Sequence, residues 1–179
     1  MGCSLPAETS TGEDYAFPEV YVEGVTPSNE YVVEVNGSYL LLKTPVFENA
    51  KRFFGHIIYE DVLNFLDLIE ATAKRSFLVI KKYSPPHMEG LLIEKNTKLC
   101  FIEVRGHYPI VYVSEGDGVD VGDKIAYIVT GKGEVRVVKS PCSGIVVLSV
   151  NITWERPEKY ILVVVDRNDC RRVTIRKSS

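Results

Sequence analysis

The sequence predicts a small α+β domain over residues 17–86, followed by an all-β domain over residues 87–179. Three observations predict this arrangement: a strong hairpin signal and one amphipathic helical segment in the first part, and a long series of short β-rich runs in the second. Two prolines and a glycine in "SPPHMEG", residues 84–90, mark the boundary between the domains. Residues 1–16 are polar, and we expect them to form a disordered tail.

The first domain is expected to contain a hairpin, a helix and a strand. Asn36 and Gly37 separate the runs "YVVEV" and "SYLLLK", and both turn positions of a tight hairpin need positive φ. In "YEDVLNFLDLIEATAK", residues 59–74, apolar side chains recur at helical spacing. Those on the apolar face are Val62, Phe65, Leu66, Ile69 and Ala73. The run "SFLVIKKY" that follows is predicted to be a strand.

The second domain has no helical pattern of useful length. Its predicted strands are "GLLIEK", "KLCFIEV", "PIVYVS", "KIAYIVT", "EVRVVK", "GIVVLSV", "KYILVVVD" and "RRVTIRK". Turn residues separate these runs at close spacing, which is typical of an all-β barrel or sandwich.

Composition and charge exclude several classes of protein. The chain is 45% apolar and 25% charged, with a net charge of -3, so no basic field favours a nucleic-acid partner. No apolar run reaches the length of about 18 residues that a membrane-spanning helix needs, and the first residues lack the apolar segment of a signal peptide. We therefore expect a cytoplasmic protein without membrane contact. The absence of Gln and the many Val, Ile, Lys and Glu residues favour a thermophilic source, in which a disulfide inside the cell is possible.

The residues that most often bind metals are scattered. The four cysteines form no C-x-x-C pair, so no metal site is expected. Cys142 has no neighbouring base in sequence, and we interpret it as a small apolar filler rather than a nucleophile. Asp117, Asp120 and Asp123 alternate as in a calcium loop, but the twelfth position of that loop is Ile128, where a bidentate Glu is required. Turn roles explain these three aspartates.

The stretch "EGDGVDVGDKIAYI" resembles the signature of biotinyl and lipoyl domains, which are small barrel-sandwich hybrids. The matching residues are Gly116, Asp117, Val119, Gly122, Asp123, Ala126 and Ile128. "SPCSGIVV" resembles a second strand start of that family through Pro141, Gly144 and Val146. The resemblance covers roughly residues 98–166 and implies a barrel-sandwich hybrid for the second domain. Glycines that adopt positive φ and aspartates that bind back to backbone amides define turns, so the matched residues specify a fold and no cargo.

Lys132, in "TGKGE", is the candidate carrier residue. In modified members of the family the carrier lysine lies ten residues after the second motif glycine, and ten residues after Gly122 is Lys132. Biotin acceptors place Met on both sides of that lysine and lipoate acceptors place Asp before it, whereas this chain has Gly131 and Gly133. We therefore expect an unmodified hairpin tip and no cofactor, with covalent biotin or lipoate on Lys132 as the alternative.

The loop "NITWERPEKY" replaces the second Gly-Asp turn of the family. Trp154, Arg156 and Tyr160 make it a candidate contact surface, because Trp, Tyr and Arg are common in binding hot spots. In the alternative interpretation, Trp154 caps the end of the barrel and Arg156 pairs with an acidic residue.

Three classes of function compete on these observations: a non-catalytic binding or scaffold protein, a carrier that uses Lys132, and an enzyme. No paired carboxylates, Cys-His pair or nucleotide-binding loop can be located, so no catalytic residues are predicted and we expect no enzyme. A binding protein with an unknown protein partner is the first expectation, and edge strands could support a homodimer. The whole chain resembles an uncharacterised archaeal family through its C-terminal tail and the "ERPE" loop.

Overall fold

A computed structural model describes residues 17–46, 48–81, 87–152 and 157–177. This part of the chain contains sixteen strands and two short 3₁₀ helices, so the protein is nearly all β. The prediction of an α+β first domain is therefore wrong. The predicted tail, residues 1–16, lies outside the described residues. Within the described ranges there is no helix long and apolar enough to cross a membrane.

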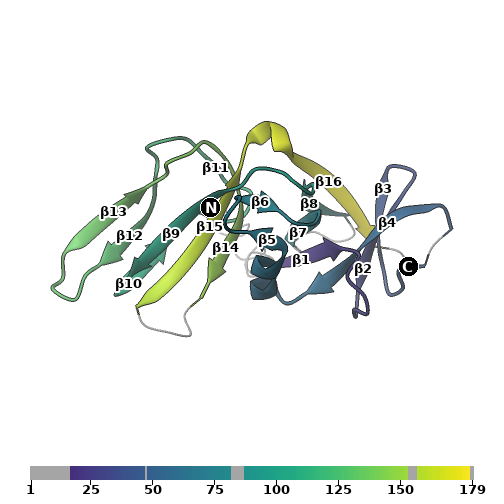
Figure 1. Ribbon diagram of the computed structural model, residues 1–179, viewed down its shortest axis with the longest axis horizontal. Coiled ribbons are helices and arrows are strands. Elements are labelled where there is room, and N and C mark those ends of the chain that lie inside the picture. Colours follow the sequence, from purple (N-terminus) through teal and green to yellow (C-terminus); the bar gives the residue numbers. More distant parts are fainter. Residues whose placement is uncertain (1–16, 47, 82–86, 153–156, 178–179) are drawn as a thin grey trace, which may run out of the picture.

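Seven strands form a closed barrel, on the right of Figure 1. In their order around the barrel they are β1 (Pro18–Glu23), β4 (Ala50–Ile57), β2 (Tyr31–Val35), β3 (Ser38–Leu42), β16 (Cys170–Lys177), β8 (His87–Ile93) and β7 (Phe77–Lys81). All neighbours are antiparallel except β3 and β16, which are parallel. The last strand of the chain thus completes a barrel that begins with the first.

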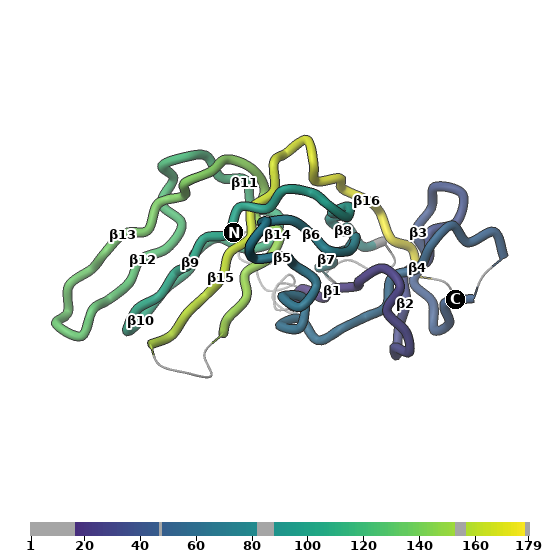
Figure 2. The backbone as a smooth tube through the Cα atoms, in the orientation of Figure 1, coloured from purple at the N-terminus to yellow at the C-terminus, as the bar shows by residue number. Residues whose placement is uncertain are grey.

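Two further sheets, here called the two-sheet unit, lie on the left of Figure 1. One sheet contains β10 (Tyr108–Val111), β12 (Lys124–Val129) and β13 (Val135–Lys139). The other contains β11 (Gly118–Val119), β14 (Gly144–Asn151), β15 (Glu158–Val165) and β9 (Cys100–Gly106). After β15 the chain passes through the 3₁₀ helix η2 (Arg167–Asp169) and returns to the barrel as β16, as the tube in Figure 2 shows. The two-sheet unit is therefore inserted between two barrel strands.

The predicted helix over residues 59–74 is absent. A 3₁₀ helix, η1 (Tyr59–Phe65), is followed by a small ribbon of β5 (Leu66–Asp67) and β6 (Thr72–Ala73). The Asp67 carboxylate accepts hydrogen bonds from the backbone N–H groups of Ile69 and Glu70, and Ala71 adopts a φ of 55°. Short polar side chains of this kind compete with helical hydrogen bonds, and a left-handed residue ends a helix.

The other predicted elements of the first part are confirmed. Asn36 and Gly37 adopt φ values of 50° and 80° and join β2 to β3 in a two-residue hairpin turn. The run "SFLVIKKY" contains β7, and each β-rich run of the second part overlaps one of the strands β8, β9, β10, β12, β13, β14, β15 and β16. Alternation and turn residues were therefore reliable signals for strands in this chain.

The buried apolar side chains of the described residues form four clusters, one of them a small cluster on β2, and the other three build the layers of the core. Side chains from all seven barrel strands fill the interior of the barrel, among them Tyr21, Phe54 and Ile175. A second cluster packs the outer side of β1, β7 and β8 against β14 and β15, with Phe77 and Leu148 fully buried. A third cluster joins β14, β15 and β9 to the three-stranded sheet. The four-stranded sheet is therefore the middle layer of the molecule, covered on both faces.

One end of the barrel is closed by charged side chains instead of apolar ones. Arg52 donates from Nε to Glu34, at 2.7 Å, and from both Nη atoms to the carboxylate of Glu94, at 2.7 and 2.9 Å. Ser76 donates a further hydrogen bond to Glu94, at 2.8 Å. The hydrogen bonds from Arg52, followed by that from Ser76, lower the pKa of Glu94 to about 2.

Buried hydrogen bonds join η1, the 3₁₀ helix that follows barrel strand β4, to the two-sheet unit. The hydroxyl of Tyr59 in η1 donates to the carboxylate of Glu115, and the backbone N–H of Ser149 donates to the same hydroxyl at 2.8 Å. Burial, together with the nearby Glu115 carboxylate, raises the pKa of Tyr59 above its ordinary value, so the hydroxyl keeps its proton. Glu115 is itself buried, and Tyr59 therefore satisfies a carboxylate that has little access to water.

Replacing Tyr59 with Phe is expected to lower the free energy of unfolding by about 1–3 kcal/mol, because Glu115 loses a donor while it stays buried. Chemical denaturation would measure this, with Tyr160→Phe as the matched control because the hydroxyl of the half-buried Tyr160 has no hydrogen-bond partner among the described residues. Equal stability of the two variants would mean that the Tyr59 hydroxyl does not hold the two parts together.

The Glu94 carboxyl predicts a dependence of stability on pH. Its pKa is about 2 in the folded protein against an ordinary value of 4.5, so the unfolded chain binds the proton more tightly. The resulting stabilisation is complete above about pH 4.5 and is lost as the pH falls towards 2. Glu94→Gln should reduce the loss of unfolding free energy between neutral pH and pH 3. Glu103→Gln is the control, since Glu103 is equally exposed and has a single partner, Lys159. An unchanged pH profile in Glu94→Gln would contradict the assignment.

Candidate functional site

Lys132 lies in the loop of the β12–β13 hairpin. The Gly133 N–H donates to the Thr130 carbonyl at 2.9 Å, and the Thr130 N–H donates to the Glu134 carbonyl at 2.8 Å. Gly133 adopts a φ of 82°, which gives a three-residue loop with a left-handed glycine at its third position. The Thr130 hydroxyl accepts from the Glu134 N–H and closes the loop. The hairpin thus presents the Lys132 side chain to solvent.

The loop brings no reactive group to Lys132. Within the described residues, its ammonium has no ion-pair partner, and no cluster of His, Cys, Asp or Glu side chains could hold a metal ion. The arrangement supplies an accessible amine on a rigid turn, but no base or electrophile beside it.

Of the three residues predicted to form the contact loop, the structure describes only Tyr160. Tyr160 lies in β15, paired with Asn151 on one side and Val104 on the other. It is half-buried and packs against the cluster between the two sheets. Trp154 and Arg156 lie outside the described residues.

The outer side of the three-stranded sheet is apolar. We define the hairpin face as seven apolar side chains on the outward side of β10, β12 and β13 and of the residue after β10; they are Tyr108, Ile110, Tyr112, Tyr127, Val129, Val135 and Val137. The cross-strand pair of Lys124 and Lys139 ends this apolar stretch on the same sheet. The apolar side chains form two rows across the sheet, because Val129 pairs with Tyr108 and Val135, and Tyr127 pairs with Ile110 and Val137. Rings of Tyr112 and Tyr127 are 6.0 Å apart. In a sheet with one solvated face, outward positions are normally polar.

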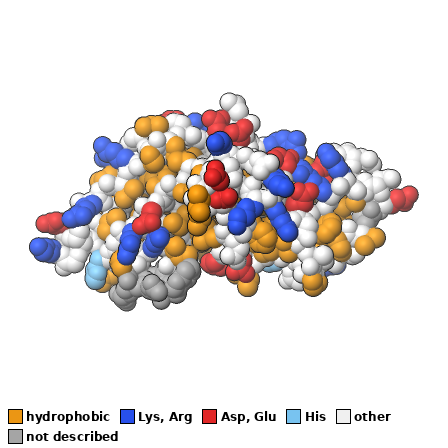
Figure 3. Space-filling view, in the orientation of Figure 1, with side chains coloured by type: hydrophobic (Ala, Val, Ile, Leu, Met, Phe, Trp, Pro, Cys, Tyr) orange, Lys and Arg blue, Asp and Glu red, His pale blue; other side chains and the backbone are white. Residues whose placement is uncertain are grey.

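The exposure of this face is substantial. Five of its side chains, those of Tyr108, Ile110, Tyr112, Val135 and Val137, are between 42% and 61% exposed. No charged side chain interrupts the two rows. In the view of Figure 3, hydrophobic side chains are visible on the half of the molecule that contains the two-sheet unit, with Lys and Arg side chains between them.

The predicted turn roles are confirmed for Asp117 and Asp123, whereas the carboxylate of Asp120 pairs with Arg167 at 3.4 Å. Asp117 accepts from the Ser114 N–H and Asp123 accepts from the Asp120 N–H, each at 2.8 Å. Gly116 and Gly122 adopt φ values of 99° and 92°. These residues therefore shape the two turns that lead into β11 and β12.

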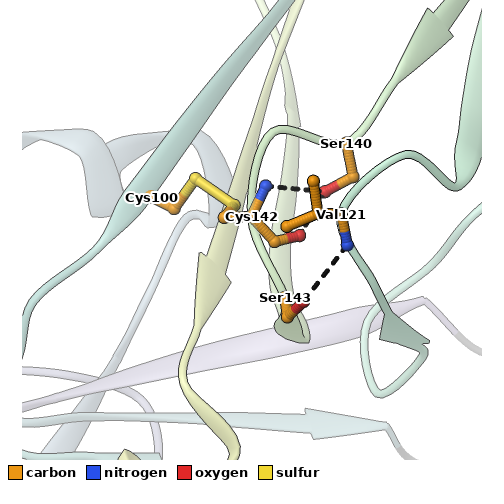
Figure 4. The surroundings of a disulfide bond; sticks show 5 residues. All are labelled: Cys100, Val121, Ser140, Cys142 and Ser143. Carbon is orange, nitrogen blue, oxygen red and sulfur yellow. Dashed lines mark hydrogen bonds between the residues drawn. A yellow bond between two sulfur atoms is a disulfide. The ribbon is translucent and has the colours of Figure 1, made fainter.

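The interpretation of Cys142 as a small apolar filler is wrong. Cys142 forms a disulfide with Cys100, and 42 residues separate the two in sequence. Figure 4 shows the bond beside the turn before β14, where Cys142 N–H donates to Ser140 and the Val121 N–H donates to Ser143. The disulfide ties the start of β9 to this turn, so Cys142 is not available as a nucleophile.

Comparison with known proteins gives the family. Residues 15–167 match the family described as "Uncharacterized protein conserved in archaea (DUF2118)". This chain belongs to that family. A curated relative, "Uncharacterized protein MJ0859" of Methanocaldococcus jannaschii, is 26% identical over 161 residues, which are 86% of this chain and 94% of the relative. The resemblance of the chain to an uncharacterised archaeal family is thereby confirmed.

The hairpin face was missed by sequence reasoning, although a signal for it exists. The runs "YPIVY" and "AYIV" are apolar at successive positions, not only at alternate ones. Such strands have apolar side chains on both faces. One face of this sheet packs on the cluster of β14 and β15, and the other is the hairpin face.

Proposed function

We propose that this archaeal family member is a non-catalytic binding or scaffold protein that self-associates through the hairpin face. The observation that supports the proposal most strongly is that two adjacent rows of uncharged side chains lie on the solvent side of a three-stranded sheet. Contiguous exposed apolar patches of this kind mark interaction sites in soluble proteins. Tyrosine is also enriched at binding hot spots, and the face contains Tyr108, Tyr112 and Tyr127.

The free edge of the same sheet favours a second copy as the occupant. Within the described residues β13 pairs with β12 alone, so its other side presents unpaired backbone groups. Another chain of the same sequence offers the same edge, and pairing of the two would bury the edges and bring the two hairpin faces into one surface. The face has on the order of 500 Å² of apolar area, against the roughly 800 Å² per partner of a stable interface, and the paired edge would add to it.

The sequence of β13 also permits such pairing. A two-fold axis perpendicular to the sheet keeps both hairpin faces on one side and places Val137 opposite its own copy. In that register Arg136 lies opposite a copy of Val138, and Lys139 lies opposite a copy of Val135. No like charges face each other, as stable strand pairing requires.

Val137→Lys should weaken the dimer at least about tenfold, because pairing would bring two lysines together at the centre of the interface. Sedimentation analysis of the protein over a concentration series would measure this, with the wild-type chain expected at twice its monomer mass. Val121→Lys is the matched control: Val121 is 66% exposed and lies in a turn outside the hairpin face.

Two outcomes would contradict self-association through this face. One is a wild-type protein that stays monomeric across the series. The other is a Val121→Lys variant that dissociates as readily as Val137→Lys, since the effect would then come from added charge alone. Circular dichroism would check that both variants keep their β structure.

A covalent carrier is the second candidate function, supported by the position of Lys132 at the exposed tip of the hairpin. The resemblance of the two-sheet unit to biotinyl and lipoyl domains in its Gly-Asp turns adds support for biotin or lipoate as the cargo. The glycines on both sides of Lys132 weigh against it, because a ligase reads the lysine together with its flanking residues. We therefore rank this function below binding and expect Lys132 to carry no group.

Peptide mass spectrometry of the protein from its native cells tests the carrier function directly. Trypsin cleaves after unmodified Lys132 and releases residues 125–132, whereas an acylated lysine resists cleavage and leaves residues 125–136 joined. We expect the shorter peptide alone. The longer peptide with the added mass of biotin or lipoate would reverse the ranking of the two functions.

A further inference from the structure

A cleft opens in the barrel where β3 and β16 separate. Their parallel register begins only at Tyr39 and Ile175, so residues 171–174 of β16 pair with β8 and not with β3. The hairpin turn at Gly37 forms the opposite wall. The volume of the cleft is about 400 Å³, which lies in the range of small-molecule sites.

Three arginines from one strand line this cleft. Arg171, Arg172 and Arg176 all lie in β16 and are exposed to solvent. Ser38 and Thr174 add hydroxyl groups to the lining. Figure 3 shows basic side chains, with acidic ones between them, gathered over this part of the barrel. The cleft is therefore polar and locally basic on a chain whose net charge is -3.

The acidic side chains near the cleft already have basic partners. Glu34, which lines it, is buried and bound by Arg52 at 2.7 Å, with Lys51 at 3.8 Å. Glu94 is bound by both Nη atoms of Arg52. Both carboxylates share the one guanidinium of Arg52, and Arg171 also helps to lower the pKa of Glu94, so the negative charge near the cleft is only partly neutralised by Arg52 and Lys51.

The three arginines differ in the hydrogen bonds and ion pairs that their side chains form with other residues. Arg172 donates to Glu89 at 2.7 Å and to the Gly116 carbonyl at 3.3 Å, so it is held at the rim. Arg171 donates from Nη2 to the hydroxyl of the buried Tyr39 at 2.8 Å. This hydrogen bond orients the guanidinium, whose other N–H groups have no hydrogen-bond partner among the described residues. In the part of the chain that the structure describes, Arg176 has no hydrogen-bond or ion-pair partner.

We propose that this cleft binds a small ligand through a phosphate group. Guanidinium groups match the geometry of phosphate oxygens and stay charged at all physiological pH values. Arg176 and Thr174 lie on the same face of β16, next to Ser38 of β3, and these three side chains would contact the phosphate; Arg171 lies on the opposite face of the strand, at the inner end of the cleft beside Tyr39. The concave shape and small volume favour a phosphorylated small molecule over a polymer. This inference is independent of self-association, because the cleft lies in the barrel and the hairpin face lies in the two-sheet unit.

Isothermal titration calorimetry with inorganic phosphate and pyrophosphate, at about 0.15 M ionic strength, tests the proposal. The full chain should bind pyrophosphate saturably at one site. Arg176→Ala should weaken binding about tenfold or more through loss of charge-assisted hydrogen bonds. Arg176 is the first choice for substitution because its removal breaks no described contact of the fold.

Arg105→Ala is the matched control, since Arg105 is an exposed arginine of β9 outside the cleft lining. Its affinity for pyrophosphate should equal that of the wild type. Absence of binding to the wild-type chain would overturn the proposal. Equal weakening by Arg105→Ala and Arg176→Ala would overturn it too, because attraction to the overall charge would then explain the binding.

Discussion

The middle sheet can be stable only when both of its faces are covered, because β14 and β15 present apolar side chains to both sides. Residues 162–165 are all buried, although alternate members of this run point in opposite directions. The barrel covers one face and the three-stranded sheet covers the other. The chain therefore has to build a layer on each side of β15, and the return of β16 to the barrel follows from that requirement.

The same constraint explains where the two candidate surfaces arise. The three-stranded sheet covers the middle sheet with one face, and nothing in the described chain covers its other face, the hairpin face. The cleft arises because β16 reaches the barrel from the two-sheet unit and joins β3 only from Ile175 onwards. One surface is apolar and belongs to the insertion, whereas the other is basic and belongs to the barrel.

Local patterns predicted local structure well. Asn36-Gly37, Gly116 and Gly122 adopt the positive φ angles that their turns require, and the β-rich runs became strands. The amphipathic pattern of residues 59–74 predicted a helix that the structure does not contain. Ile69 belongs to the apolar face of that predicted helix but is 93% exposed in the folded chain. In that segment the Asp67 carboxylate accepts hydrogen bonds from backbone N–H groups, and Ala71 adopts a left-handed φ. These two local features prevent a helix, although five apolar side chains recur at helical spacing.

The sequence by itself determined the strands, most turns, and Lys132 as the tip of a hairpin, because each depends on residues close together in the chain. Only the tertiary structure decided that Cys142 meets Cys100, that Tyr59 reaches Glu115, and that Arg171 and Arg176 line a cleft beside Tyr39. Each of these contacts joins residues tens of positions apart, through strand order and register. Alternation along one strand carries no information about which strand will lie beside it. The sequence could therefore signal that strands of the hairpin face are apolar on both sides, but it could not place that face or the cleft.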